Sequence, residues 1–126
     1  MSPRHGLVGV TVDCLDVERV GRFWAALFEA PLRDSLAGWR RLGPLTPDGP
    51  VLTFQPVPEA RVGKVRLHLD VVTDDLDASI ARVAELGGGA PLERHEYPGE
   101  GVVVVVADPE GHAFCLVEYA PGVSPE

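Results

Sequence analysis

The sequence has few cysteines and few basic residues, and each shortage excludes a class of protein. Its 126 residues include 2 cysteines, Cys14 and Cys115, so a disulfide-rich secreted scaffold is excluded. Its 11 lysines and arginines stand against 19 aspartates and glutamates, which gives a formal net charge of −8. This balance argues against nucleic-acid and anionic-membrane partners. Because no charged and apolar signal segment precedes the first expected strand, we expect a cytoplasmic, reduced protein.

Long apolar runs and familiar catalytic motifs are also absent from the sequence. The longest apolar run, residues 102–107, is far shorter than the roughly 20 residues that cross a bilayer, so we expect no membrane partner. The sequence contains no Gly-x-Ser-x-Gly elbow, no phosphate-binding glycine loop and no Cys-x-x-Cys pair. With 45% hydrophobic residues, a chain of this length is expected to form one domain.

The first half of the chain has the pattern of a strand, a helix and further strands. Residues 7–13 alternate between apolar and polar side chains, as a half-buried strand does. Asp16 suits a helix N-cap, and Pro31 ends the helix that follows. Apolar residues recur at helical spacing between them, as in a core-facing stripe: Val17, Val20, Trp24 and Leu27. Short strands are expected over residues 38–42 and 51–57.

The second half repeats this order of elements. Residues 66–72 alternate again, and Asp74 or Asp75 suits the N-cap of a second helix. The glycines at 87–89 end that helix, because glycine tolerates the left-handed backbone of a C-cap. Strands are then expected over three segments, the last two joined by a turn at 108–111: residues 91–97, 102–107 and 112–119.

Comparing the chain with itself shows that the two halves are related. A shift of 59 residues aligns Gly9 with His68, and a shift of 60 residues aligns Phe54 with Phe114. The sequence therefore predicts an α+β protein of two tandem βαβββ modules. The expected order is a first module, a connector and a second module, at about residues 7–57, 58–64 and 65–119.

One face of each module's first strand is expected to line a groove. The apolar faces of these strands must pack on the helices, so the opposite faces point away from the helices. Gly9, Thr11, His68 and Asp70 lie on those opposite faces. The pattern therefore predicts that these four residues point into the groove.

Three stretches carry a resemblance to a known family. They are the 16–27 helix with its Phe-Trp pair, Arg-Leu-His-Leu-Asp-Val at 66–71, and Asp-Pro-Glu-Gly-His-Ala-Phe at 108–114. With the paired modules, they resemble the vicinal oxygen chelate superfamily, which holds glyoxalase I, extradiol dioxygenases, fosfomycin-modifying enzymes and bleomycin-resistance proteins. The resemblance spans residues 7–119. It implies a single domain with a cup-shaped mixed sheet, a small-molecule cavity between the modules and, commonly, a homodimer.

The resemblance also implies where a metal would be held. Metal-dependent members use histidines and glutamates near the starts of the first and last strands of each module, and the matching residues here are Gly9, Gln55, His68 and Cys115. Val51 is another match for the Gln55 position. Gly9 has no side chain, Gln55 offers a neutral carbonyl and Cys115 is soft. We therefore predict no metal and no other cofactor; a metal, if present, would use His68, Cys115 and Gln55.

Two candidate residues keep alternative interpretations. His68 either makes a structural hydrogen bond, within the sheet or to Asp70 or Arg66, or contacts a ligand as an anchor or base. Cys115 is either a buried small residue or a reactive thiol paired with His68.

Two candidate pairs also keep alternatives. Trp39 and Arg41 share a face of the 38–42 strand, and they pack at a dimer interface or present a ring and a guanidinium to a ligand. His95 and Tyr97 share a face of a later strand, and they close the cavity or lie on an exposed edge.

These observations favour a metal-independent protein that binds a small organic molecule, of a sequestering or resistance type. The expected ligand-binding residues are Trp39, Arg41, Gln55, His68, Asp70, His95, Tyr97 and Cys115. The alternative is a glyoxalase-like lyase or isomerase, or a dioxygenase, that uses His68 as its base or as a residual metal ligand. The sequence does not decide whether the protein is an enzyme.

Overall fold

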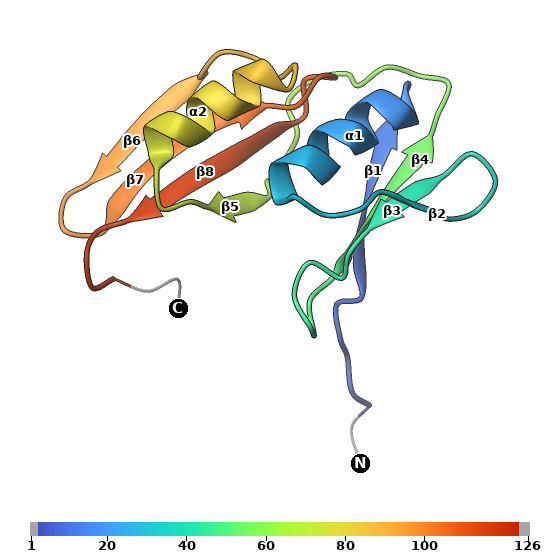
Figure 1. Ribbon diagram of the computed structural model, residues 1–126, viewed down its shortest axis with the longest axis horizontal. Coiled ribbons are helices and arrows are strands. Elements are labelled where there is room, and N and C mark those ends of the chain that lie inside the picture. Colours follow the sequence, from blue (N-terminus) through green and yellow to red (C-terminus); the bar gives the residue numbers. More distant parts are fainter. Residues whose placement is uncertain (1–2, 124–126) are drawn as a thin grey trace. The chain divides into compact units, whose positions relative to one another are not determined.

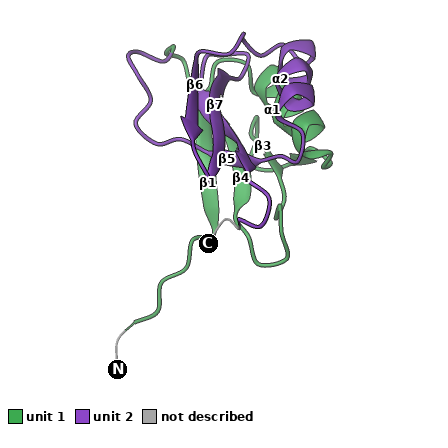
Figure 2. Cartoon of the chain, turned by 90° about the vertical axis from the view of Figure 1, so that its left-hand side faces the viewer, with its two compact units in different colours: residues 1–60 green, residues 61–126 purple. Residues whose placement is uncertain are grey.

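The structure is a computed structural model that describes residues 3–123. The chain forms two compact units, unit 1 (Met1–Ala60) and unit 2 (Arg61–Glu126), which Figure 2 draws in green and purple. Each unit contains one helix and one four-stranded sheet. Among the described residues, no helix is long and apolar enough to cross a membrane.

Unit 1 follows the expected βαβββ order. Its sheet has the order β1-β4-β3-β2, in which β1 runs parallel to β4 and the other neighbours are antiparallel. The elements, labelled in Figure 1, are β1 (Gly9–Cys14), α1 (Val17–Phe28), β2 (Arg33–Asp34), β3 (Arg40–Leu42) and β4 (Val51–Pro56).

Unit 2 repeats the same topology. Its sheet has the order β5-β8-β7-β6, again with the first and last strands parallel and the other neighbours antiparallel. Its elements are β5 (Asp70–Val72), α2 (Leu76–Glu85), β6 (Glu93–Tyr97), β7 (Gly101–Ala107) and β8 (Ala113–Tyr119). The identical strand order confirms the predicted α+β fold of two βαβββ modules.

Helix α1 forms as its sequence pattern predicts. The Asp16 side chain accepts a hydrogen bond from the Arg19 backbone N–H at 3.1 Å, which caps the helix. The helix ends at Phe28 and is capped by Glu29, which has a left-handed φ of 52°. Trp24 is 1% exposed and Phe23 meets it edge-on, with ring centroids 5.4 Å apart. These two rings confirm that the apolar stripe of α1 faces the core.

Helix α2 is joined to its sheet at its first residue. Of the two predicted caps, Asp75 is the one used, because its side chain accepts from the Ala78 N–H at 3.1 Å. The Glu118 carboxylate on β8 also accepts a hydrogen bond from the Leu76 N–H at 2.9 Å. Both carboxylates satisfy backbone donors that a helix N-terminus leaves unpaired, and they sit where the helix dipole favours negative charge.

The core of each unit lies between its helix and one face of its sheet. In unit 1 the buried strand residues are Cys14, Leu42, Leu52 and Phe54. In unit 2 they include Val104, Val106, Phe114 and Leu116. Since side chains alternate along a strand, every second residue points to the opposite face, which the helix does not cover.

The first strand of unit 2 is shorter than predicted, and this part of the sequence-based expectation was wrong. Residues 66–69 lie outside β5, and Leu67 is 92% exposed. The hydrogen bonds between β5 and β8 extend one residue before β5, where the Cys115 backbone N–H donates to the Leu69 carbonyl at 2.9 Å. The paired residues of β5 and β8 begin at Asp70 and Cys115, so His68 stays outside the ladder although the same register would place it beside Ala113, the first residue of β8.

Other strand boundaries also differ from the predicted ones. The strand predicted over residues 7–13 begins at Gly9, and Val8 before it is exposed. The strand predicted over residues 38–42 begins at Arg40, so Trp39 lies outside it. Strand β2 was not predicted, because two exposed residues show no periodicity.

A buried carboxylate holds the turn between β7 and β8. Asp108 is 2% exposed and accepts hydrogen bonds from the backbone N–H groups of Glu110 and His112, at 2.9 and 3.0 Å. It also accepts one from Nδ1 of His112 at 2.8 Å. His112 therefore closes this turn, and the Asp-Pro-Glu-Gly segment forms the turn that the sequence predicted.

We predict that Asp108→Asn lowers the free energy of unfolding by about 2 kcal/mol, because an amide cannot accept all of these hydrogen bonds while buried. Urea unfolding followed by circular dichroism measures the change. Asp77→Asn on the exposed surface of α2 is the matched control and should cost about 0.5 kcal/mol or less. Equal losses in the two variants would contradict the role of Asp108.

Candidate functional site

The sheet of unit 2 has one face that α2 does not cover. We call it the helix-free face of unit 2. Strand register places its residues in three rows across the sheet. The first row is Asp70, Cys115, Val105 and Glu93. The second row is Val72, Val117, Val103 and His95. The third row is Tyr119, Gly101 and Tyr97.

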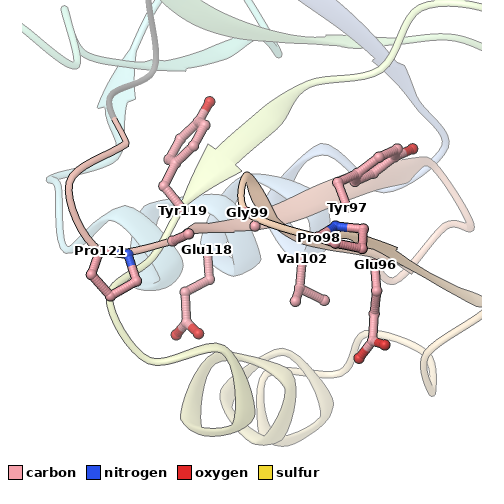
Figure 3. A pocket seen from close by; sticks show the side chains of 10 residues that line it. Glu96, Tyr97, Pro98, Gly99, Val102, Glu118, Tyr119 and Pro121 are labelled. Carbon is pink, nitrogen blue, oxygen red and sulfur yellow. The ribbon is translucent and has the colours of Figure 1, made fainter.

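The close-up view agrees with this assignment of faces. In Figure 3 the Tyr97 and Tyr119 rings stand on one side of the sheet, and Glu118 and Val102 point to the other side, toward a helix. Four residues that the sequence proposed for ligand binding belong to this one face: Asp70, His95, Tyr97 and Cys115.

The face has an apolar middle and polar ends. Val103, Val105 and Val117 are half-buried and adjoin one another on β7 and β8. Asp70 and Glu93 lie at the two ends of the first row, on the outer strands β5 and β6. A small apolar strip between a few polar groups is the usual composition of a ligand site.

The Cys115 thiol is held in its neutral form. It is 7% exposed, and burial is the main cause that raises its pKa above the ordinary value. The Asp70 carboxylate raises the pKa further, by its charge and by a side-chain hydrogen bond, and Glu93 adds a smaller effect. No cation acts on this thiol among the causes of the shift, so the chemistry of a reactive thiolate is not favoured.

His95 and Tyr97 lie on an edge strand as well as on the helix-free face. All residues of β6 are exposed, and β6 ends the sheet. Nε2 of His95 lies 3.1 Å from a Glu93 carboxylate oxygen on the same face. His95 and Tyr97 therefore lie on an exposed edge, and their role in closing a cavity stays a prediction.

His68 does not share this face through strand alternation. It precedes β5 and is exposed. It lines a separate hollow of about 520 Å³ with Lys64, Val65 and Arg66. Its placement therefore differs from that of Asp70, with which the sequence pattern grouped it.

Unit 1 has a corresponding helix-free face of more polar character. It includes Thr11, Thr53, Gln55 and Arg41, of which Thr53 and Gln55 are half-buried. Glu18 of α1 pairs with Arg40, the neighbour of Arg41, so the two arginines point to opposite faces.

The register of unit 1 also bears on the positions matched to metal ligands. Gly9 pairs with Val51, whereas Gln55 pairs with Asp13 at the other end of the strands. Gln55 and Val51 are the two residues matched to the expected ligand position on the last strand of unit 1. Val51 is the one that lies beside Gly9.

Trp39 is half-buried in the turn before β3. Its backbone N–H donates a hydrogen bond to the Leu36 carbonyl at 2.8 Å. Because Trp39 lies outside the strand, the register of β3 does not assign its ring to a face. Both of its proposed roles, at a dimer interface or against a ligand, stay predictions.

The side chains proposed for a metal do not form a suitable set of ligands. His68 lies outside the strand, Cys115 is held as a neutral thiol and Gln55 offers only an amide. Within residues 3–123, no group of three or more histidine, cysteine, aspartate or glutamate side chains is arranged to hold a metal ion. The residues present therefore do not fit a family-type metal centre.

Sequence reasoning missed Glu93, Tyr119 and the valine strip. The signal was the alternation within residues 93–97 and 115–119, which places every second side chain on one face. The sequence pattern does not give the register between strands, and that register places Tyr119 in the same row as Tyr97.

Comparison with known proteins identifies the family. A sequence model of the glyoxalase-like domain matches residues 9–117. The chain belongs to the glyoxalase-like domain family. This confirms the resemblance to the glyoxalase, bleomycin-resistance and dioxygenase superfamily. No curated protein sequence matches the chain significantly.

Solved structures of this superfamily share the fold of the glyoxalase-like chain. A glyoxalase/bleomycin resistance protein/dioxygenase from Nocardioides matches with a TM-score of 0.70 and 16% identity, over 100% of this chain and 91% of that chain. The fosfomycin resistance protein FosX from Mesorhizobium loti matches with a TM-score of 0.72 and 21% identity, over 94% and 96%.

A mutant FosX from Listeria monocytogenes, complexed with Mn(II) and 1S,2S-dihydroxypropylphosphonic acid, matches with a TM-score of 0.75 and 16% identity, over 94% of this chain and 95% of that chain. At such identities the likeness establishes the fold and leaves the chemistry open.

We predict that Asp70→Asn lowers the pKa of the Cys115 thiol, because it removes a negative charge and an acceptor that stabilise the protonated form. Iodoacetamide should then alkylate Cys115 several-fold faster at a given pH near neutrality, as measured by peptide mass spectrometry. Asp74→Asn is the control, since Asp74 does not contribute to the shift. Equal rates in both variants would show that Asp70 does not influence the thiol.

Proposed function

We propose that the protein binds a small organic molecule without a metal ion and that the helix-free face of unit 2 forms its binding surface. The observation that carries the proposal is the half-buried strip of Val103, Val105 and Val117 between the polar ends of that face. A ligand covering this strip would gain free energy from the apolar area removed from water. Asp70 and Glu93 would orient its polar groups.

Two further properties describe the ligand that this surface favours. The strip is made of β-branched side chains on a pleated sheet, which offers a broad, shallow contact to an aromatic or polycyclic molecule. The two carboxylates and the net charge of −8 favour a neutral or positively charged ligand over an anion.

A sequestering or resistance-type role is the form of this proposal that we favour. FosX is named as a fosfomycin resistance protein, and its Listeria relative was solved with Mn(II). The chain shares the fold with FosX, but no group of three or more metal-binding side chains occurs among its described residues, so we propose binding without a metal. We do not propose His68 as a general base, because it precedes β5 and strand register does not assign it to the helix-free face.

The remaining parts of the proposal concern assembly and location. We propose a homodimer in the cytoplasm, in which a second copy covers exposed apolar side chains. Several such side chains lie outside the strands, including Leu36, Leu67 and Leu92.

We predict that the neutral fluorescent dye N-phenyl-1-naphthylamine binds saturably and that Val117→Ser weakens its affinity about fivefold, or about 1 kcal/mol. Dye fluorescence at increasing protein concentration measures the affinity. The control is Val62→Ser, because Val62 is 94% exposed and lies outside the face. A loss of dye affinity in this control would report non-specific adsorption. Dye affinity that is unchanged in Val117→Ser, or that falls equally in both variants, would contradict the proposed surface.

We also predict that protein purified without chelator contains far less than one transition-metal ion per chain, because too few donors are brought together. Inductively coupled plasma mass spectrometry measures the metal content. Dialysis against EDTA should leave dye affinity unchanged. One tightly held ion per chain, or loss of dye binding after EDTA, would overturn the metal-independent proposal.

A further inference from the structure

We infer that Tyr97 and Tyr119 form a binding site for an organic cation of the substituted ammonium type, at the end of the β6–β7 hairpin. This inference rests on the proposed function and names the ligand group that one part of the helix-free face would recognise. Three observations support this site: the strand register, the glycine between the two tyrosines, and the charges around them.

The two tyrosines flank a single glycine. Gly101 on the middle strand pairs with Tyr97 on one side and with Tyr119 on the other. All three residues belong to one row of the same face, and Figure 3 shows both rings rising from one side of the sheet. Because neighbouring strands lie about 4.8 Å apart, the two tyrosine backbones are separated by about 10 Å.

The backbone keeps the gap between the rings free of a side chain. Gly101 has a φ of 153°, and a Cβ built on it would overlap the carbonyl oxygen of Glu118. Another residue at this position would strain the pairing of β7 with β8. The gap is therefore a property of the backbone and does not depend on a movable side chain.

The width of the gap decides between two kinds of ligand. A flat ring stacked between two tyrosines needs the rings about 7 Å apart, since carbon atoms pack at about 3.5 Å. A cation is attracted to an aromatic face within about 6 Å of the ring centroid. If both rings stand upright on backbones about 10 Å apart, a cation midway between them would lie about 5 Å from each side. The spacing therefore fits a substituted ammonium group better than a stacked ring.

The charges around the gap favour the same ligand. Tyr97 and Tyr119 are among the ten residues that line a hollow of about 340 Å³, and none of the ten is lysine, arginine or histidine. Two of these residues are Glu96 and Glu118. A second hollow shares Glu118 and Tyr119 and adds Asp74, again without a basic residue.

These carboxylates act at a distance and do not contact the bound group. Figure 3 shows the Glu96 and Glu118 side chains on the side of the sheet opposite the tyrosine rings. Glu118 accepts a hydrogen bond from the Leu76 N–H, and Arg94 pairs with Glu96 at 3.5 Å. The rings would therefore provide the direct contact, and the negative potential would exclude anions.

The test compares a cation with its neutral isostere. Choline and 3,3-dimethylbutan-1-ol have nearly the same shape and differ in charge, and titration calorimetry measures the affinity of each. We expect choline to bind at least tenfold more tightly than the alcohol. Tyr97→Leu and Tyr119→Leu should each weaken choline binding about fivefold to tenfold. Tyr97→Phe and Tyr119→Phe keep the rings and should stay within about twofold of the original protein.

Other outcomes would overturn the inference. Equal affinity for the alcohol, no measurable choline binding, or unchanged affinity in both leucine variants would each contradict a cation site between the rings. Unfolding temperatures of the leucine and phenylalanine variants show whether a loss reflects misfolding. N-phenyl-1-naphthylamine binding separates the two proposals: if the dye binds the valine strip while choline does not bind, the cation site alone fails.

Discussion

Each unit depends on one amphipathic helix that covers one face of one four-stranded sheet. Trp24 and Phe23 of α1, with Phe54 on β4, form the centre of the unit 1 core. Val83 of α2, with Phe114 on β8, has the corresponding role in unit 2. Full burial of such a side chain contributes about 1.5 to 3 kcal/mol, which makes this packing the main source of stability in each unit. A single helix covers only one face of a sheet, so the opposite face is free of this constraint.

The alternation of strands couples the core to the candidate site. Val104 and Leu116 are buried under α2, and their neighbours Val103 and Val117 therefore belong to the helix-free face. Substitutions on that face can change ligand chemistry while the core keeps its packing. This separation explains how one fold serves proteins of different activities, and why family membership does not determine the ligand.

Negative charge and apolar surface are combined on the helix-free face of unit 2. Burial raises the pKa of the Cys115 thiol, and Asp70 and Glu93 at the edge of the face raise it further, so the middle of the face presents an uncharged surface. At the hairpin end, two tyrosines border a glycine, with carboxylates on the far side of the sheet. The same arrangement that argues against thiolate or metal chemistry favours binding of neutral or cationic organic groups.

The sequence by itself determined the two helices, the repeated βαβββ order and the faces of most strands, because caps and hydrophobic periodicity act over short stretches of chain. It predicted that Asp70, His95, Tyr97 and Cys115 belong to a site, and they do share one face. Only the tertiary structure decided where β5 begins, which rows cross the sheet and that Tyr119 lies in the row of Tyr97. Pairing between distant strands sets these features: His68 alternates like a strand residue, but the pairing of β5 with β8 begins at Asp70 and its hydrogen bonds extend back only to the Leu69 carbonyl.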